Sequence, residues 1–494
     1  MKKFYALILI GCIILSLAGC KTDAPDGESF YSYFEYVEDS SDTTESEEYT
    51  SSSNDIQSSS SKTESKNDTP SQNSSVTAPQ TPPKAPEKPT AENNSPTVEN
   101  VTVNKEEIKE PETEKLEEEV KIETHHIPLS ASKYYQLSTL TGKEKKIYGV
   151  ISNCASKALN IADISRLKVK YETAYTVLQK FIADNPQYFY ISRSFIITSN
   201  ADTGDILAII ISYTDGTVTD TFDDSLNLIK SADRKIISEK IEKFNKKIEG
   251  ILSNIPSNFT ELEKEKLIHD YIQKTVTYDY NAATTLYPSS STLPHAYDIY
   301  GAAVNGKAVC EGYSKLFQYL CYCTGINSTQ VTGIADGGAH MWNAVNIDGK
   351  WYQIDVTWDD GSNYLSYSYF NLTTSQISTD HKAETKYTSV PDCTATENSA
   401  INTFIVHVSN MSNQPDNYKS AIDMAVKLKD KRIYVYFDNP QTNNGIIDLN
   451  YYMAYIQRYF FNNSTGVGIY VQQKGLNIAS TVNGVGDMIY LTIK

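Results

Sequence analysis

Cysteine is scarce in this sequence, with seven residues among 494. Two of them, Cys12 and Cys20, fall within or directly after the apolar segment at the N-terminus. The other five are odd in number and scattered along the chain, which argues against a disulfide framework and leaves at least one thiol free. These five are Cys154, Cys310, Cys321, Cys323 and Cys393.

The sequence also lacks a basic patch, so nothing in it indicates nucleic-acid binding. The net charge is −17, but the segment from Lys21 to His125 alone holds 25 acidic and 9 basic residues. The rest of the chain is therefore close to neutral. The sequence shows no metal-ligand cluster, nucleotide-binding loop, paired-carboxylate spacing or calcium loop, and we predict neither a metal nor a cofactor.

The N-terminal segment has the composition of an export signal. Two lysines follow Met1, and the residues from Phe4 to Leu17 form an apolar run that is too short to span a membrane. The run ends in Leu-Ala-Gly-Cys20, which resembles the lipobox of bacterial lipoproteins. We therefore expect residues 1–19 to be a signal peptide and Cys20 to be lipidated, anchoring the chain at the outer face of the cell membrane. The alternatives are a plain cleavable signal with an incidental cysteine, or a buried helix.

Residues 20–125 are rich in Ser, Thr, Glu, Asn and Pro. A segment of this composition cannot bury enough apolar surface to offset the entropy lost on ordering, so we predict that it is disordered. It would act as a tether that lifts the folded part off the membrane, or it would be filler without a function. The low use of arginine beside lysine and the Ser/Thr/Pro-rich tether fit a Gram-positive cell surface.

Order is expected to begin near Ile127, and residues 127–255 should form a helical region that contains a β-hairpin. Thr260 followed three residues later by Glu263 fits a capping box, which predicts a helix start at this point. The predicted helices are residues 143–159, 167–183, 231–252 and 260–275, and the predicted strands are residues 188–197 and 205–214.

Residues 395–494 are predicted to form a small separate α/β domain. The expected order is strand 404–408, helix 416–428, strand 432–437, helix 451–461, and strands 468–472 and 488–493. The region contains no cysteine and a single histidine, His407. We find no group of residues in it that indicates chemistry.

Cys310 lies at the start of a predicted helix for which Gly325 is a natural C-terminal stop. A thiol at a helix N-terminus lies at the positive end of the helix dipole, which favours the thiolate. Cys310 is therefore a candidate nucleophile, although its position alone is equally compatible with a cysteine that only packs. Cys321 and Cys323, in the body of the same helix, fit a packing role.

A predicted β-hairpin brings a histidine close to a carboxylate. The dipeptide Asp348-Gly349 between two alternating runs favours a two-residue turn, which pairs residues whose numbers sum to 697. His340 would then lie opposite Thr357, and Trp342 opposite Asp355. His340 and Asp355 become diagonal neighbours on one face, so that the carboxylate can orient the imidazole as a general base for a thiol. The histidines that are less suitably placed are His125, His126, His269 and His295.

Several blocks of this sequence resemble the bacterial transglutaminase-like superfamily. The resemblance covers about 100 residues and implies an α+β fold in which a cysteine-bearing helix packs on an antiparallel sheet. It favours a transglutaminase-like domain over residues 256–392. The blocks are Tyr278-Asp-Tyr, Gly301-Ala-Ala-Val-Asn-Gly-Lys-Ala-Val-Cys-Glu-Gly-Tyr, His340-Met-Trp-Asn and Trp351-Tyr-Gln-Ile-Asp-Val-Thr-Trp-Asp-Asp, followed by Tyr369-Phe-Asn-Leu-Thr and Asp380-His381.

The resemblance implies that Cys310 is the nucleophile, His340 the base and Asp355 the residue that orients the base. The backbone N–H of Cys310 would help to stabilise an oxyanion. A second oxyanion donor is expected, and Tyr278 and Tyr297 are the candidates.

The function that we expect is that of a surface-tethered thiol enzyme, which attacks a peptide or carboxamide carbonyl in a peptide or protein substrate. Hydrolysis is favoured over cross-linking to a lysine amine, because excluding water needs a dedicated acceptor tunnel that the sequence does not indicate. The alternative is a non-catalytic surface binding module on the same fold. The complete set of three residues favours the enzyme, although a fold alone does not fix an activity. The sequence leaves the oligomeric state open.

Overall fold

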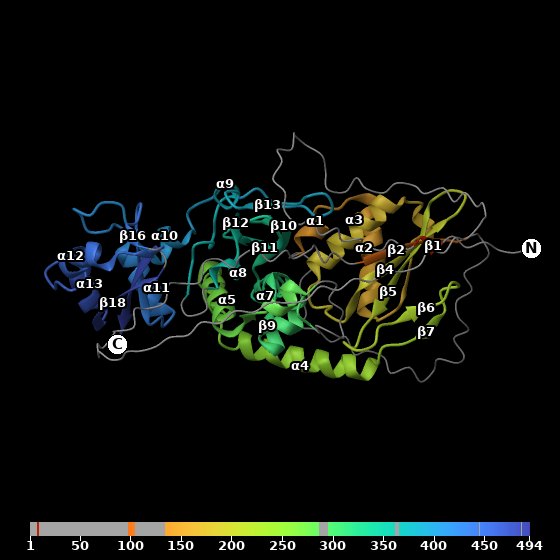
Figure 1. Ribbon diagram of the computed structural model, residues 1–494, viewed down its shortest axis with the longest axis horizontal. Coiled ribbons are helices and arrows are strands. Elements are labelled where there is room, and N and C mark those ends of the chain that lie inside the picture. Colours follow the sequence, from red (N-terminus) through yellow and green to blue (C-terminus); the bar gives the residue numbers. More distant parts are fainter. Residues whose placement is uncertain are drawn as a thin grey trace, which may run out of the picture. The chain divides into compact units, whose positions relative to one another are not determined.

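The computed structural model describes residues 7–8, 97–103, 134–285, 295–360, 365–443, 445–485 and 487–494, which belong to one compact unit (Figure 1). The chain has an α+β fold, as the sequence predicted. Among the helices of this described part, none is both long and apolar enough to cross a membrane. Cys20, His125 and His126 lie outside the described residues.

The N-terminal region is built on a sheet with the strand order β1-β2-β4-β5-β3. β4 and β5 pair antiparallel around a short turn, which confirms the predicted hairpin. Three predicted helices are also present, with ends that differ by a few residues. The elements are α1 (Tyr135–Ser138), α2 (Gly142–Ser156), β3 (Ile161–Asp163), α3 (Tyr171–Asp184), β4 (Ile191–Asn200), β5 (Ile206–Tyr213), β6 (Thr221–Phe222), β7 (Leu228–Lys230) and α4 (Arg234–Leu252).

Strand β2 (Thr97–Val103) corrects part of the disorder prediction for residues 20–125. It runs parallel to β4 over its whole length, and β1 (Leu7–Ile8) pairs antiparallel with it. Five of its seven residues are Thr or Val, and β-branched residues favour strands. The composition of a long segment predicts its average behaviour, so it misses a short run that can pair with the edge of an existing sheet.

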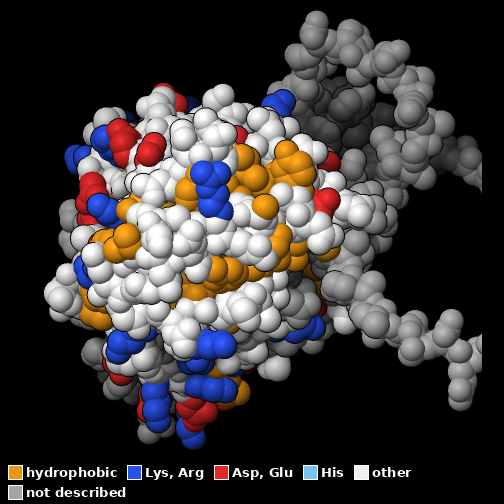
Figure 2. Space-filling model, turned by 90° about the vertical axis from the view of Figure 1, so that its left-hand side faces the viewer, with side chains coloured by type: hydrophobic (Ala, Val, Ile, Leu, Met, Phe, Trp, Pro, Cys, Tyr) orange, Lys and Arg blue, Asp and Glu red, His pale blue; other side chains and the backbone are white. Residues whose placement is uncertain are grey.

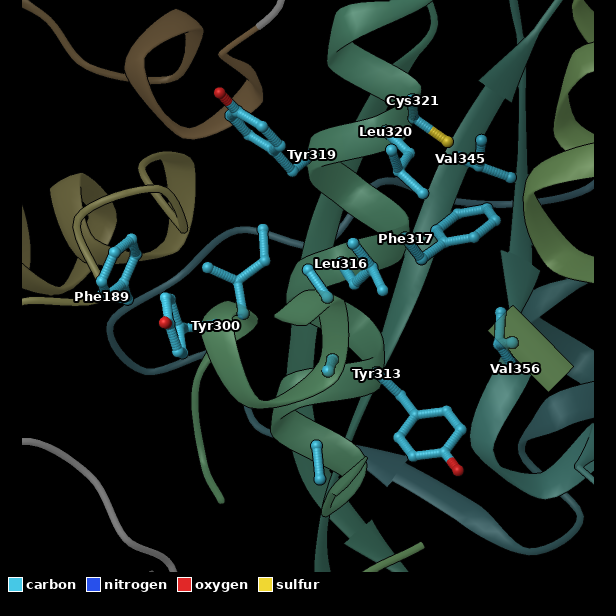
Figure 3. Packing of buried hydrophobic residues seen from close by; sticks show 14 of the residues in the cluster. Phe189, Tyr300, Tyr313, Leu316, Phe317, Tyr319, Leu320, Cys321, Val345 and Val356 are labelled. Atoms are coloured by element: carbon cyan, nitrogen blue, oxygen red, sulfur yellow. The ribbon is translucent and has the colours of Figure 1, made fainter. Parts of the chain in front are cut away.

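The central region places helix α7 (Cys310–Cys323) on a sheet with the order β12-β11-β10-β13. Phe317 and Cys321 extend from α7 and lie beside Val345 of β11 (Figure 3). The predicted capping box of Thr260 and Glu263 is present at the start of α5. The elements are α5 (Glu261–Thr275), β8 (Thr277–Tyr278), α6 (Tyr280–Thr284), a π-helical turn (Gly301–Asn305), β9 (Lys307–Ala308), β10 (Asn327–Ala335), β11 (Gly338–Ile347), β12 (Lys350–Ile354), α8 (Val356–Asp359), α9 (Thr374–Ile377) and β13 (His381–Ala383).

The C-terminal region has a four-stranded sheet with the order β14-β15-β19-β18. The predicted strand at residues 468–472 is wrong, because Gly466–Gln473 is helix α13, in which Val467 and Val471 are buried one turn apart. Strand β18 was not predicted. The elements are α10 (Ala400–Thr403), β14 (Ile405–Val408), α11 (Tyr418–Lys427), β15 (Arg432–Phe437), β16 (Thr442–Asn443), β17 (Ile446–Ile447), α12 (Leu449–Tyr459), α13, β18 (Ile478–Val485) and β19 (Met488–Ile493).

The C-terminal region has a hydrophobic cluster of its own between its sheet and its helices. It also contacts α5, since Lys427 forms an ion pair with Glu263 and Asp430 forms one with Lys266.

Figure 2 shows one face of the molecule. A band of apolar side chains crosses the middle of this face, and most of the charged side chains lie near the margins of the face.

Candidate active site

Cys310 is the first residue of α7, and the backbone on its N-terminal side is tightly fixed. β9 pairs parallel with β8, which places Tyr278 in register with Ala308, two residues before the cysteine. Gly312 lets Ala308 pack against the first turn of α7, because a Cβ at residue 312 would lie 2.5 Å from the Cβ of Ala308. The thiol thus lies at the N-terminus of a 14-residue helix, as predicted, and Cys310 is 8% exposed.

The other cysteines are placed for packing. All five cysteines of the described residues are free thiols. Burial raises the pKa of Cys321 well above its ordinary value and raises that of Cys323 and Cys393 to about 12. Burial also raises the pKa of Cys154. These four thiols are therefore protonated at neutral pH and poor nucleophiles.

His340 projects from β11 and meets Asp355 at the end of β12. His340 Nε2 lies 2.6 Å from Asp355 Oδ2, a hydrogen-bond distance. The predicted register is confirmed from the pair Ile347–Lys350 to the pair Asn343–Ile354. The sequence therefore predicted correctly that this carboxylate reaches this imidazole.

The predicted pairs beyond Ile354 are wrong, because the strand ends there. Asp355 is the N-cap of α8, and its Oδ1 accepts hydrogen bonds from the N–H groups of Thr357 and Trp358. Thr357 belongs to this helical turn and does not lie opposite His340. A side chain that can cap a helix competes with the strand for the backbone that follows it.

The charges around His340 favour its protonated form. Burial lowers the pKa of His340, but the Asp355 carboxylate, and next the Cys310 side chain, outweigh that effect and raise the pKa to about 10. Burial also acts to raise the pKa of Asp355, yet the neighbouring imidazoles hold it well below its usual range. Since Nε2 of His340 faces Asp355, Nδ1 is the ring nitrogen left for Cys310. The arrangement suits a thiolate–imidazolium–carboxylate series.

His381 is a second histidine that contacts the same carboxylate, and no role was predicted for it from the sequence. Its Nε2 lies 3.1 Å from Asp355 Oδ2, and its Nδ1 lies 2.5 Å from Asp380 Oδ1. The Asp380-His381 dipeptide was part of the family resemblance. This dipeptide was the only indication in the sequence that His381 belongs to the site. The pairing of β13 with β10 brings His381 here, and it joins residues that are far apart in the sequence.

Aromatic rings surround the two imidazoles. The Trp358 ring centroid lies 5.7 Å from that of His340 and 4.5 Å from that of His381. Trp342 lies 4.9 Å from His381, and its indole N–H is hydrogen-bonded to Gln353. These rings exclude water from the carboxylate, which strengthens the interactions among the charged groups.

His340, Asp355 and His381 also offer one ligand atom each within 4.8 Å of one another, a set that could be considered for a metal ion. In a tetrahedral zinc site with bonds near 2.1 Å, neighbouring ligand atoms lie about 3.4 Å apart. The separation of 2.6 Å between His340 and Asp355 is shorter than this. A shared proton fits the geometry better than a metal ion does.

The two tyrosines that were candidates for the oxyanion differ in position. The Tyr297 hydroxyl donates to the carbonyl of Ala282 at 2.8 Å, so its hydrogen is used elsewhere. Burial, and next the nearby Cys310 side chain, raise the pKa of Tyr278. The Tyr278 hydroxyl therefore keeps its hydrogen near Cys310. Of the two, only Tyr278 remains a candidate donor.

Comparisons with known proteins point to one family. The family model described as the transglutaminase-like superfamily matches residues 250–356, which include Cys310, His340 and Asp355. The kyphoscoliosis peptidase of Homo sapiens is 28% identical over 114 residues, a match that covers 21% of this chain and 16% of that protein. The Mus musculus protein of that name is 27% identical over 114 residues and is covered to the same extent. The chain thus spans less than a fifth of the length of these relatives. A solved structure described as that of a TGase aligns over 35% of this chain and 52% of its own, with 18% identity and a TM-score of 0.22.

Proposed function

Because the chain contains a domain of the transglutaminase-like superfamily, we propose that it is a thiol enzyme in which Cys310 attacks the carbonyl of a peptide or carboxamide. The observation that carries this proposal is the position of His340. Its imidazole is 2.6 Å from the Asp355 carboxylate and close enough to Cys310, at the start of α7, for that side chain to raise its pKa.

The reaction follows from these groups. The Cys310 thiolate bonds to the carbonyl carbon, and the carbonyl oxygen becomes an oxyanion near the N–H groups of the first turn of α7 and the Tyr278 hydroxyl. The tetrahedral intermediate then collapses and expels the amine, which takes a proton from His340 and leaves a thioester on Cys310. His340, now neutral and held by Asp355, takes a proton from the second substrate as that substrate attacks the thioester and releases the thiolate.

Water as the second substrate makes the enzyme a protease or amidase, and a lysine amine makes it a cross-linking transferase. We favour hydrolysis, since two of the relatives carry the name peptidase. The first half of the reaction is the same for both outcomes. Incubation of a labelled peptide with and without an added amine separates them, because hydrolysis gives the free acid even when the amine is abundant.

We also place the enzyme at the outer cell surface, tethered through a lipid on Cys20. The apolar run and the Leu-Ala-Gly-Cys20 sequence support this location. Metabolic labelling with a fatty acid tests it. Label on the wild type and its loss in Cys20→Ala are the expected results, whereas an unlabelled protein that is released into the medium contradicts the tether.

The thiol itself is tested in the full chain by the rate of iodoacetamide alkylation from pH 5 to pH 10. We expect one cysteine to react rapidly at pH 6, where an ordinary thiol is protonated, and mass spectrometry should identify it as Cys310. Cys310→Ala and His340→Ala should both abolish this reaction. Cys154→Ser is the matched control, since that thiol is buried in α2 of the N-terminal region. Slow alkylation of Cys310 at pH 6 contradicts the proposal and favours a non-catalytic binding module.

A further inference from the structure

The Asp355 carboxylate accepts hydrogen bonds on both oxygens. Oδ1 accepts from the N–H of Thr357 at 2.9 Å and from that of Trp358 at 3.2 Å. Oδ2 accepts from His340 at 2.6 Å and from His381 at 3.1 Å. The backbone contacts fix Oδ1 at the start of α8, so the two imidazoles together decide where Oδ2 points.

Other groups fix the Nδ1 side of the His381 ring. Its Nδ1 contacts Asp380 Oδ1 at 2.5 Å, and Asp380 Oδ2 accepts from the Tyr369 hydroxyl at 2.7 Å. Its backbone is paired with Ala335 of β10, and its side chain has no exposed surface. The Trp358 ring packs against it. The imidazole therefore has little freedom to turn away from Asp355.

Each ring nitrogen of His381 faces a carboxylate oxygen, so the ring joins Asp355 to Asp380. The other titratable groups that pack against the ring are His340 of β11 and Tyr369, with ring centroids 5.4 Å and 5.5 Å away. Cys310 at the start of α7 and Asp359 at the end of α8 are the next titratable groups of the site.

We infer that His381 is a positioning residue of the Cys310 site, which holds Asp355 Oδ2 in line with His340. The inference rests on the proposed function, because it assigns His381 a role in activating the same thiol. Without the second imidazole, Oδ2 has one donor and can swing away from His340. The protonated form of His340 then loses the carboxylate that stabilises it, which disfavours the thiolate, so the alkylation profile of Cys310 moves to higher pH.

Two variants of the full chain separate the contact with Asp355 from the contact with Asp380. His381→Gln can place an amide N–H where Nε2 was, whereas His381→Asn reaches only the position of Nδ1. At pH 6 we expect Cys310 alkylation to fall about 10- to 100-fold in His381→Asn, the size of effect typical of the loss of a residue that orients a ligand or catalytic group. The restored donor should limit the loss in His381→Gln to less than about tenfold. His381→Asn should also show the displacement to higher pH.

Two tyrosines provide a milder test that does not disturb the imidazole. Tyr369→Phe removes the hydroxyl that holds Asp380 and should slow alkylation at pH 6 by about two- to fivefold. Tyr367→Phe removes a buried hydroxyl from Asp270 instead, and is expected to leave the rate unchanged. This pair decides the question if the His381 variants do not fold.

Each outcome has a defined meaning. Folded His381 variants with the wild-type profile overturn the inference but leave the proposed function intact, provided that wild-type Cys310 reacts at pH 6. Equal losses in the Gln and Asn variants without a displacement in pH show a packing role only, and also overturn it. A wild-type Cys310 that does not react at pH 6 contradicts the proposed function itself.

Discussion

Two histidine–carboxylate pairs are anchored on the same short helix, α8, and they differ in what the second ring nitrogen meets. Asp355 at the start of α8 binds His340, whose other neighbour is the Cys310 side chain. Asp359 at the end of α8 binds His269 Nε2 at 3.0 Å, and His269 Nδ1 lies 3.3 Å from Asp270. A histidine held by a carboxylate is therefore not by itself a sign of catalysis. The group on the far side of the ring decides its role.

The surroundings of the two pairs differ as well. Burial lowers the pKa of His269, but Asp270 and Asp359 outweigh burial and raise it. Asp270 in turn binds Lys266 at 2.8 Å, and Lys266 also reaches Asp430 of the C-terminal region at 3.1 Å. The His269 pair thus belongs to a buried ionic network that joins α5 to the C-terminal region. We assign it to stability and the His340 pair to chemistry.

The largest effect that tests this assignment comes from removing one charge at each end of α8. Asp355→Asn should lower the turnover of an amide substrate by about 10²- to 10⁴-fold, because His340 loses its orientation and its stabilised charge. Asp359→Asn should leave turnover within about threefold of the wild type, and should lower the free energy of unfolding by about 1–3 kcal/mol. Steady-state kinetics and urea unfolding measure the two quantities. Equal losses of turnover in the two variants contradict the assignment of the His340 pair to chemistry and of the His269 pair to stability.

A second test addresses the ionic network. Lys266→Met removes the buried ammonium that Asp270 and Asp430 share, and removal of one member of a buried ionic group costs about 3–5 kcal/mol of stability. Lys427→Met is the matched control, because Lys427 also joins the C-terminal region to α5 but is 44% exposed. Its loss should cost less than about 1 kcal/mol. Urea unfolding monitored by circular dichroism gives both values, and similar losses in the two variants contradict a stabilising network.

Glu265 lies on α5, the helix that carries His269, and it makes the stability of the folded protein depend on pH. Burial raises its pKa to about 8, and its Oε1 has no hydrogen-bond partner within the described part of the chain. The folded protein therefore keeps a proton that the unfolded chain releases near pH 4.5. Stability contributed by the protonated form is complete below pH 4.5 and is lost as the pH rises toward 8, by up to about 1.4 kcal/mol per pH unit.

Unfolding at pH 5 and pH 8 tests this dependence. Glu265→Gln should lose less stability between these two pH values than the wild type does, since its amide does not titrate. Glu249→Gln, on the exposed face of α4, should behave as the wild type does. If the wild type and Glu265→Gln lose the same stability between pH 5 and pH 8, the raised pKa of Glu265 is contradicted.

The sequence predicted the parts of the site that local rules control. The Asp348-Gly349 turn set the register that brings His340 toward Asp355, and the spacing of apolar residues placed Cys310 at a helix start. His381 could not be found in this way, since 26 residues separate it from Asp355 and the pairing of β13 with β10 brings it back. The strand predicted at residues 468–472, within helix α13 (Gly466–Gln473), was wrong for another reason. A short apolar run fits a helix as well as a strand, and burial of Val467 and Val471 one turn apart decided it.

The smallest effect that we expect concerns Tyr278, and it separates two kinds of reaction at the same thiol. Tyr278→Phe should lower amide turnover by about tenfold, because it removes one oxyanion donor while the N–H groups of α7 remain. It should leave iodoacetamide alkylation unchanged, since alkylation forms no oxyanion. Tyr297→Phe, whose hydroxyl is bound to Ala282, is the matched control and should alter neither rate. If Tyr278→Phe slows both reactions equally, the hydroxyl acts on the thiolate itself, and the second oxyanion donor must be sought elsewhere.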